Sequence, residues 1–141
     1  MIYIILAMVL YAVGIIFGAA ASRNANTNIA AAITNIVSAA VPVIVVIPHL
    51  AKKGFASSKQ GIIFAILGGI SIAFFVMAVN KAYSVNKVGI VAPIVFGGAI
   101  FLSTVLSYFI FKEKISLLQF AGLMFLAIGF GVIIYARVVG K

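Results

Sequence analysis

The polar residues of this sequence that could do chemistry are amides and hydroxyls set among apolar residues. Asn28, Ala31, Asn35, Ser38 and Pro42 recur at intervals of three or four, so a helix would place them on one face. The Asn35 side chain offers two hydrogen-bond donors and an acceptor. Such a face can line a cavity and bind a polar solute, or it can form hydrogen bonds with a neighbouring helix.

Further candidates are hydroxyl-bearing residues and prolines within other parts of the apolar sequence. Ser103 and Ser107 are one helical turn apart, and their hydroxyls can either face a cavity or bond back to their own helix. Pro42 and Pro93 each remove one backbone hydrogen bond inside an apolar run, which suits either a hinge or a static kink. The residues predicted to line a substrate cavity are Tyr11, Thr34, Asn35, Ser38, Ser71, Pro93, Gly97, Ser103 and Ser107.

Several kinds of chemistry are excluded by what the sequence lacks. It has no cysteine, one histidine (His49) and one acidic residue (Glu113). One chain therefore cannot assemble a disulfide, a thiolate site, a His/carboxylate metal cluster or a Ser-His-Asp triad. We expect no catalytic residue, no metal and no cofactor, and we expect that the protein is not an enzyme.

The elements that must position the polar residues are long apolar runs. The chain is 66% hydrophobic and 8% charged, against about 45–50% and about 25% in soluble domains. Residues 2–21, 28–50, 61–80, 88–111 and 117–136 are each long enough to cross about 30 Å of hydrocarbon at about 1.5 Å per residue. The first run lacks the basic residues that precede a signal-peptide core, so we interpret it as a helix. The sequence predicts an all-α, multi-pass integral membrane protein with five transmembrane helices, in the cell (inner) membrane.

The charged residues all lie outside these runs. The net charge is +9, but the sequence has no basic stripe or aromatic platform, so nucleic acid is not an expected partner. We expect the basic residues to face the headgroups of the lipid bilayer. Five transmembrane helices would place five basic residues on each side, which leaves open one fixed orientation or a dual topology with antiparallel pairs. One side would carry Lys52, Lys53, Lys59, Lys112 and Lys114, and the other Arg23, Lys81, Lys87, Arg137 and Lys141.

Several short motifs resemble a known family. They are residues 80–83 (NKAY), 91–94 (VAPI), 111–119 (FKEKISLLQ), 121–122 (AG) and 129–132 (GFGV), with residues 10–14 (LYAVG) as a weaker match. In these motifs the chain resembles the EamA-type domain of the drug/metabolite transporter superfamily. The resemblance covers residues 1–141 as a single five-helix domain.

The resemblance also implies an assembly. Typical members join two such domains, inverted with respect to one another, in one ten-helix chain. This chain is half of that inverted-repeat transporter, so the resemblance implies an antiparallel homodimer. It also implies a dimer seam on the last helix, where Gly122 and Gly129 lie seven residues apart. Glu113 resembles a loop glutamate of the family, which we interpret as structural, in an ion pair or as a helix cap.

The function expected is membrane transport of a small molecule by alternating access. Proton and sodium sites in membranes usually use carboxylates, and no acid lies within the five runs, so facilitated diffusion or exchange is the simpler expectation. The same absence favours a neutral or zwitterionic metabolite, such as an amino acid, over a cation. Two alternatives stay open: a subunit of a lipid-linked sugar flippase, and a non-transporting assembly or scaffold subunit.

Overall fold

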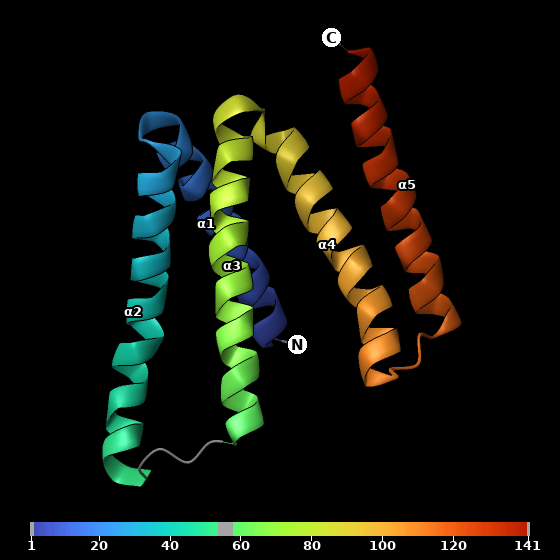
Figure 1. Cartoon of the computed structure of the whole chain (residues 1–141). Helices are drawn as coiled ribbons and strands as arrows, with labels where there is room; N and C mark the ends of the chain where they lie inside the picture. The colour runs from blue at the N-terminus through green and yellow to red at the C-terminus, as the bar shows by residue number, and fades with distance from the viewer. Residues whose placement is uncertain (1, 54–57, 141) are drawn as a thin grey trace. The chain divides into compact units, whose positions relative to one another are not determined.

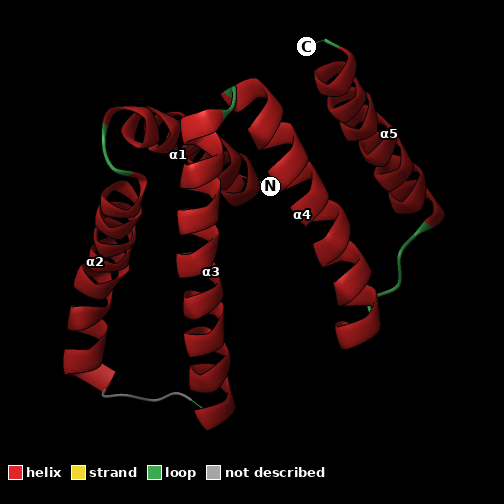
Figure 2. Ribbon diagram, turned by 45° about the horizontal axis from the view of Figure 1, so that its top comes forward, coloured by secondary structure: helices red, strands yellow, loops and turns green. Residues whose placement is uncertain are grey.

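The described part of the chain is built from five long helices (Figures 1 and 2). The computed structural model describes residues 2–53 and 58–140. All five helices are long and apolar enough to cross a membrane, so the predicted all-α, five-helix architecture is confirmed. The helices are α1 (Ile2–Asn24), α2 (Thr27–Lys53), α3 (Lys59–Val85), α4 (Val88–Phe111) and α5 (Leu117–Val139).

Four helices extend beyond the apolar runs that predicted them, whereas α4 has the predicted bounds. The largest differences are in α2, which continues through Pro48 to Lys53, and in α3, which runs on to Val85. The predicted run ends at residue 50, just after Pro48 and His49. Helical structure extends there because in or near a bilayer it satisfies backbone groups that a loop would leave unpaired, and long basic side chains can still reach the headgroups. The Lys52 and Lys53 side chains and Lys141 lie outside the described residues.

Short-range hydrogen bonds define two of the helix starts. The Asn26 side chain accepts from the backbone N–H of Asn28 at 2.9 Å, at the first turn of α2. Ser116 and Gln119 form a capping box at the start of α5, in which each side chain accepts from the other residue's backbone N–H. Lys112, with φ 53°, ends α4 in the left-handed conformation.

The chain contains two compact units, Met1–Val85 and Asn86–Lys141. In the first unit α1, α2 and α3 pack against one another. Its buried apolar residues gather where α1 ends, α2 begins and α3 ends; because several are alanines, the helices can approach closely. They are Ala19, Ala30, Ala31, Val79 and Tyr83, and the buried polar residues beside them are Ser22 and Asn80.

The second unit is a helical hairpin of α4 and α5. The loop of residues 112–116 joins the two helices, which pack against each other. The buried residues of α4 are Val91 and Gly97. A methyl group added at Gly97 would lie 3.8 Å from the Cβ of Phe130, so this glycine marks a close approach of the two helices.

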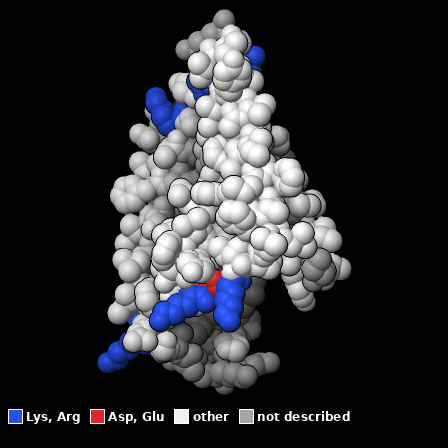
Figure 3. All heavy atoms as spheres, turned by 90° about the vertical axis from the view of Figure 1, so that its right-hand side faces the viewer, with Lys and Arg blue, Asp and Glu red and all other residues white. Residues whose placement is uncertain are grey.

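Most large apolar side chains are exposed along the helices. Phe125 is 76% exposed and Phe17 71%, values that would be unfavourable in water but suit contact with lipid. The charged residues that the structure describes lie near helix ends or in the connecting segments. In Figure 3 a surface without charge separates the charged side chains at the upper and lower parts of the visible face. The exposed surface therefore has the polarity profile of a membrane-embedded protein.

Candidate functional site

The polar face of α2 includes a half-buried amide, Asn35, with unused hydrogen-bonding capacity. Asn35 is half-buried, and its amide forms no hydrogen bond with any other described residue. Its neighbours are bonded locally: Thr34 Oγ1 donates to the Ala30 carbonyl at 2.8 Å, and Ser38 Oγ donates to the Asn35 carbonyl at 3.0 Å. Asn35 is therefore the predicted cavity residue of α2 whose donors remain open to a ligand.

The other predicted hydroxyls also bond back to their own helices. Ser71 donates to the Leu67 carbonyl at 2.9 Å, Ser103 to Ile100 at 3.0 Å and Ser107 to Thr104 at 3.0 Å. A hydroxyl has one donor, so these groups can offer a ligand only their lone pairs. Tyr11, the predicted aromatic wall residue, is 53% exposed.

The two predicted hinge prolines lie inside continuous helices, Pro42 in α2 and Pro93 in α4. Pro42 is exposed, whereas Pro93 is half-buried and lines a groove with Gly97. In this conformation each proline removes one backbone donor without interrupting its helix.

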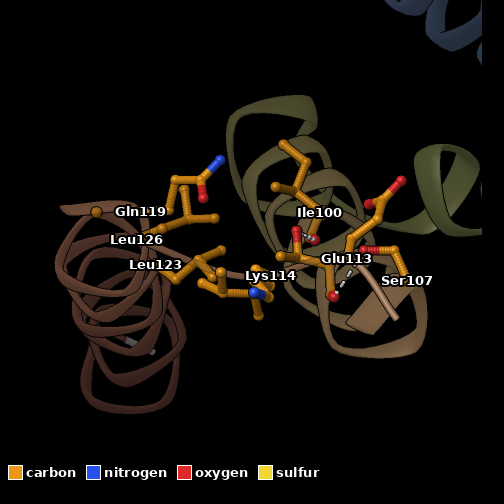
Figure 4. Close-up of a pocket in the computed structure, with 10 residues that line it drawn as sticks. Ile100, Ser107, Glu113, Lys114, Gln119, Leu123 and Leu126 are labelled. Atoms are coloured by element: carbon orange, nitrogen blue, oxygen red, sulfur yellow. Dashed lines mark hydrogen bonds between the residues drawn. The ribbon is translucent and has the colours of Figure 1, made fainter. Parts of the chain in front are cut away.

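Two open grooves follow the seam of the α4–α5 hairpin. The first has a volume of about 370 Å³; Thr104, Ser107, Gln119 and Gly122 line its walls, and Glu113 and Lys114 stand at its polar end (Figure 4). The second, of about 390 Å³, is lined mainly by apolar residues and glycines. Both grooves include Ile100 and Leu126, so they follow one another along the same seam.

These grooves bring together part of the predicted set. Ser107 and Gly122 line the first groove, and Pro93, Gly97 and Gly129 line the second, whereas Ser103 lines neither. Gly122 and Gly129, the predicted dimer-seam glycines, have no atom within 4 Å of an added Cβ. They hold open space beside α5, which a larger side chain, a lipid or a second copy could fill.

Glu113 does not have the structural role that we expected. It forms no ion pair with any other described residue, and the cap of α5 is the Ser116–Gln119 capping box. The carboxylate lies three residues before the cap, and a helix N-cap must stand directly before the first helical turn. The interpretation of Glu113 as the cap is therefore wrong, and the acid is left at the mouth of the first groove.

Two buried polar side chains of α3, which belong to the family motif at residues 80–83, were not in the set predicted to line the cavity. Asn80 is 3% and Tyr83 2% exposed, and neither Asn80 Nδ2 nor the Tyr83 hydroxyl has a hydrogen-bond partner among the described residues. Asn80 Oδ1 faces α1, 3.8 Å from where a Cβ on Gly18 would lie, and Ser22 Oγ donates to the Gly18 carbonyl at 2.7 Å. Asn80 and Tyr83 are three positions apart inside the motif at residues 80–83. This spacing is the sequence signal that could have identified them.

Five apolar spans with polar groups held between them define a multi-pass integral membrane protein. The model of the EamA-like transporter family matches residues 1–135, so the chain belongs to this family, within the drug/metabolite transporter superfamily. The resemblance predicted from the motifs is thereby confirmed, and the protein is a membrane transporter of this type. Comparisons with curated proteins and with solved structures give no match.

Proposed function

We propose that this transporter moves small neutral or zwitterionic metabolites, amino acids among them, by alternating access in the cell (inner) membrane as an antiparallel homodimer. The substrate class is supported by the distribution of charge. The only acid of the chain, Glu113, lies between α4 and α5, so no helix carries a carboxylate that could hold a cation at membrane depth. Amides and hydroxyl lone pairs remain, and these groups suit solutes that have no net charge.

The observation that carries the proposal is the unpaired amide of Asn35. This residue lies eight positions after the first residue of α2, which corresponds to about 12 Å along the helix axis. A polar group at that depth without a hydrogen bond costs free energy, so it needs a solute, a water molecule or a second chain as its partner. An amide can donate to the carboxylate of an amino acid and can accept from its ammonium group.

Asn80 and Tyr83 supply a second polar position in the first unit. Both side chains are buried with an unpaired polar atom, and they lie one helical turn apart on α3. Buried polar groups in proteins are nearly always hydrogen-bonded, so these two need a partner from outside the described residues. A polar solute or a chain of water molecules on the transport path would provide it.

Exchange assays in liposomes test the substrate class. The full-length chain is reconstituted, loaded with unlabelled leucine and assayed for uptake of radiolabelled amino acids and of a labelled organic cation. We expect exchange of amino acids, loss of most of it in Asn35→Leu, and no change in Ser84→Ala, whose hydroxyl bonds only to the Lys81 carbonyl. Uptake of the cation in place of amino acids, blocked by a carboxyl-modifying reagent, would overturn the proposal.

The absence of cysteine allows a direct test of the antiparallel arrangement. Single cysteines are placed at Lys59 and at Arg137, which lie at opposite ends of their spans, and are labelled with a membrane-impermeant maleimide in intact cells. With dual topology we expect about half of the molecules to react at each position. Complete reaction at one position and none at the other would show a single orientation and rule out the antiparallel homodimer.

A further inference from the structure

The mouth of the first α4–α5 groove carries both signs of charge. Glu113 and Lys114 both line it, and neither forms an ion pair with another described residue. Gln119 adds a donor: its Oε1 accepts from the backbone N–H of Ser116 at 2.9 Å, which orients the amide and leaves Nε2 available. The lining of this mouth therefore contains a carboxylate, an ammonium group and an amide N–H. Together these groups are complementary to a ligand that carries both a positive and a negative group.

Below this mouth the groove offers no further donors. Thr104 Oγ1 donates to the Ile100 carbonyl at 2.9 Å, and Ser107 Oγ donates to the Thr104 carbonyl at 3.0 Å, so both hydroxyl protons are used within α4 (Figure 4). Leu123 and Leu126 of α5 line the wall beyond them. The part of a ligand that lies here must therefore be apolar.

The apolar part is long because the second groove continues the first. Gln119 lines the outer end of the first groove and Ile133 the far end of the second. These two residues are fourteen positions apart on one helix, or about 21 Å at 1.5 Å per residue. One leaflet of hydrocarbon is about 15 Å deep, half of the bilayer core, so the grooves together can hold a complete acyl chain.

We propose that the α4–α5 hairpin binds one phospholipid whose zwitterionic head group carries a primary ammonium. The ammonium lies against Glu113, the phosphate against Lys114 and Gln119, and one acyl chain follows the seam past Ile100 and Leu126. Glu113, the single acid of the chain, thereby binds the ammonium of the lipid at the depth of the headgroups, where the α4–α5 loop lies. The site does not depend on which solute is transported.

The site is tested with photoactivatable lipids in liposomes that contain the full-length protein. Phosphatidylethanolamine and phosphatidylglycerol probes, each with a diazirine on the acyl chain, are crosslinked, and the labelled residues are mapped by mass spectrometry. We expect labelling by the ethanolamine lipid to concentrate at the grooves, around Ile100, Leu123 and Leu126. Because phosphatidylglycerol has no ammonium group, it should label these residues less.

Two pairs of variants separate head-group and acyl-chain recognition. Glu113→Gln should reduce the preference for the ethanolamine lipid about two- to fivefold, the size expected for an exposed charge pair. The matched control Lys87→Gln removes an exposed charge that is not at the groove and should leave the preference unchanged. Gly122→Leu fills the groove and should reduce labelling, whereas Gly131→Leu, in open space on the same helix but outside both grooves, should not.

Three results would overturn the proposal: labelling spread evenly over α1–α5, equal labelling by both lipids in the unmodified protein, or displacement of the ethanolamine probe by free leucine. The first two indicate ordinary surrounding lipid, and the third indicates a solute as the occupant. If Gly122→Leu fails to fold, the loop variant Glu113→Gln decides the outcome, because its side chain is exposed.

Discussion

Arg137 Nη2 donates a hydrogen bond to Asn86 Oδ1 and so joins the last turn of α5 to the segment just before α4. The two residues are 51 positions apart, and their contact closes the hairpin at the end opposite the 112–116 loop. The hairpin is therefore tied covalently at one end and by a side-chain hydrogen bond at the other.

This contact predicts a measurable coupling between the two residues. A double-mutant cycle with Arg137→Ala and Asn86→Ala should give a coupling energy of about 0.5–1 kcal/mol, calculated from the free energies of unfolding of the variants. This is the size expected for exposed charge-assisted pairs. The measurement is unfolding of the purified protein by increasing SDS in mixed micelles, followed by circular dichroism. Lys87→Ala paired with Arg137→Ala is the control and should show no coupling. Additive effects in the first pair would contradict a stabilising contact.

Gly97 and Gly98 should respond differently to large side chains. A Cβ at Gly97 lies at an ordinary contact distance from Phe130, 3.8 Å, whereas one at Gly98 meets nothing within 4 Å. Gly97→Ala should thus be tolerated, while Gly97→Leu should overpack the hairpin and cost about 1–3 kcal/mol. Gly98→Leu serves as the matched control. Equal losses for both leucine variants in the same unfolding assay would show that the helices do not meet at Gly97.

The capping box at the start of α5 should contribute to stability. Ser116→Ala removes the side-chain acceptor of the Gln119 backbone N–H and should lower the free energy of unfolding by about 1 kcal/mol. Ser103→Ala also removes a hydroxyl, but this one only donates to its own helix, so the change should be smaller. Thermal unfolding in detergent compares the two variants. A larger loss in Ser103→Ala would be evidence against the cap.

The unpaired amide of Asn80 should lower the free energy of unfolding while it serves transport. Its Nδ2 is buried without a partner among the described residues, an arrangement that costs about 1–3 kcal/mol, so Asn80→Leu should unfold no more easily than the unmodified protein. If the amide serves the transported solute, the same variant should lose amino-acid exchange in liposomes. Tyr83→Phe deletes only the second unpaired group, the phenol hydroxyl. This variant should also unfold no more easily than the unmodified protein and should also lose amino-acid exchange. A clear loss of stability in Asn80→Leu would instead indicate a structural hydrogen bond.

Transport should be independent of a proton gradient. No helix contains a carboxylate, and the single histidine, His49, lies near the end of α2. Amino-acid uptake into liposomes should therefore be the same with and without an imposed pH difference, and His49→Ala should leave it unchanged. Uptake that rises with an inward proton gradient and is lost in His49→Ala would contradict facilitated diffusion or exchange.

The sequence predicted the helices better than the site. The bounds of α4 follow directly from its apolar run, and the ends of α2 and α3 differ because helices extend past the last apolar residue, as at Pro48. The hydroxyls of Ser71 and Ser103 were candidates for a cavity by type and spacing, but both donate to their own helices. Sequence spacing places a side chain on a helix face, yet the acceptor that it finds depends on its rotamer and its surroundings.

By itself the sequence determined the membrane class, the number of spans and the placement of charge. These properties are local: about twenty apolar residues cross the hydrocarbon, and each helix satisfies its own backbone. Only the tertiary structure decided which faces meet. The approach of Gly97 to Phe130, the burial of Asn80 and Tyr83, and the position of Glu113 at the mouth of a groove all depend on residues far apart in the chain. Because apolar helices have little hydrophobic preference for one another over lipid, close packing and a few polar contacts select the partners, and these are not visible in the periodicity of any one run.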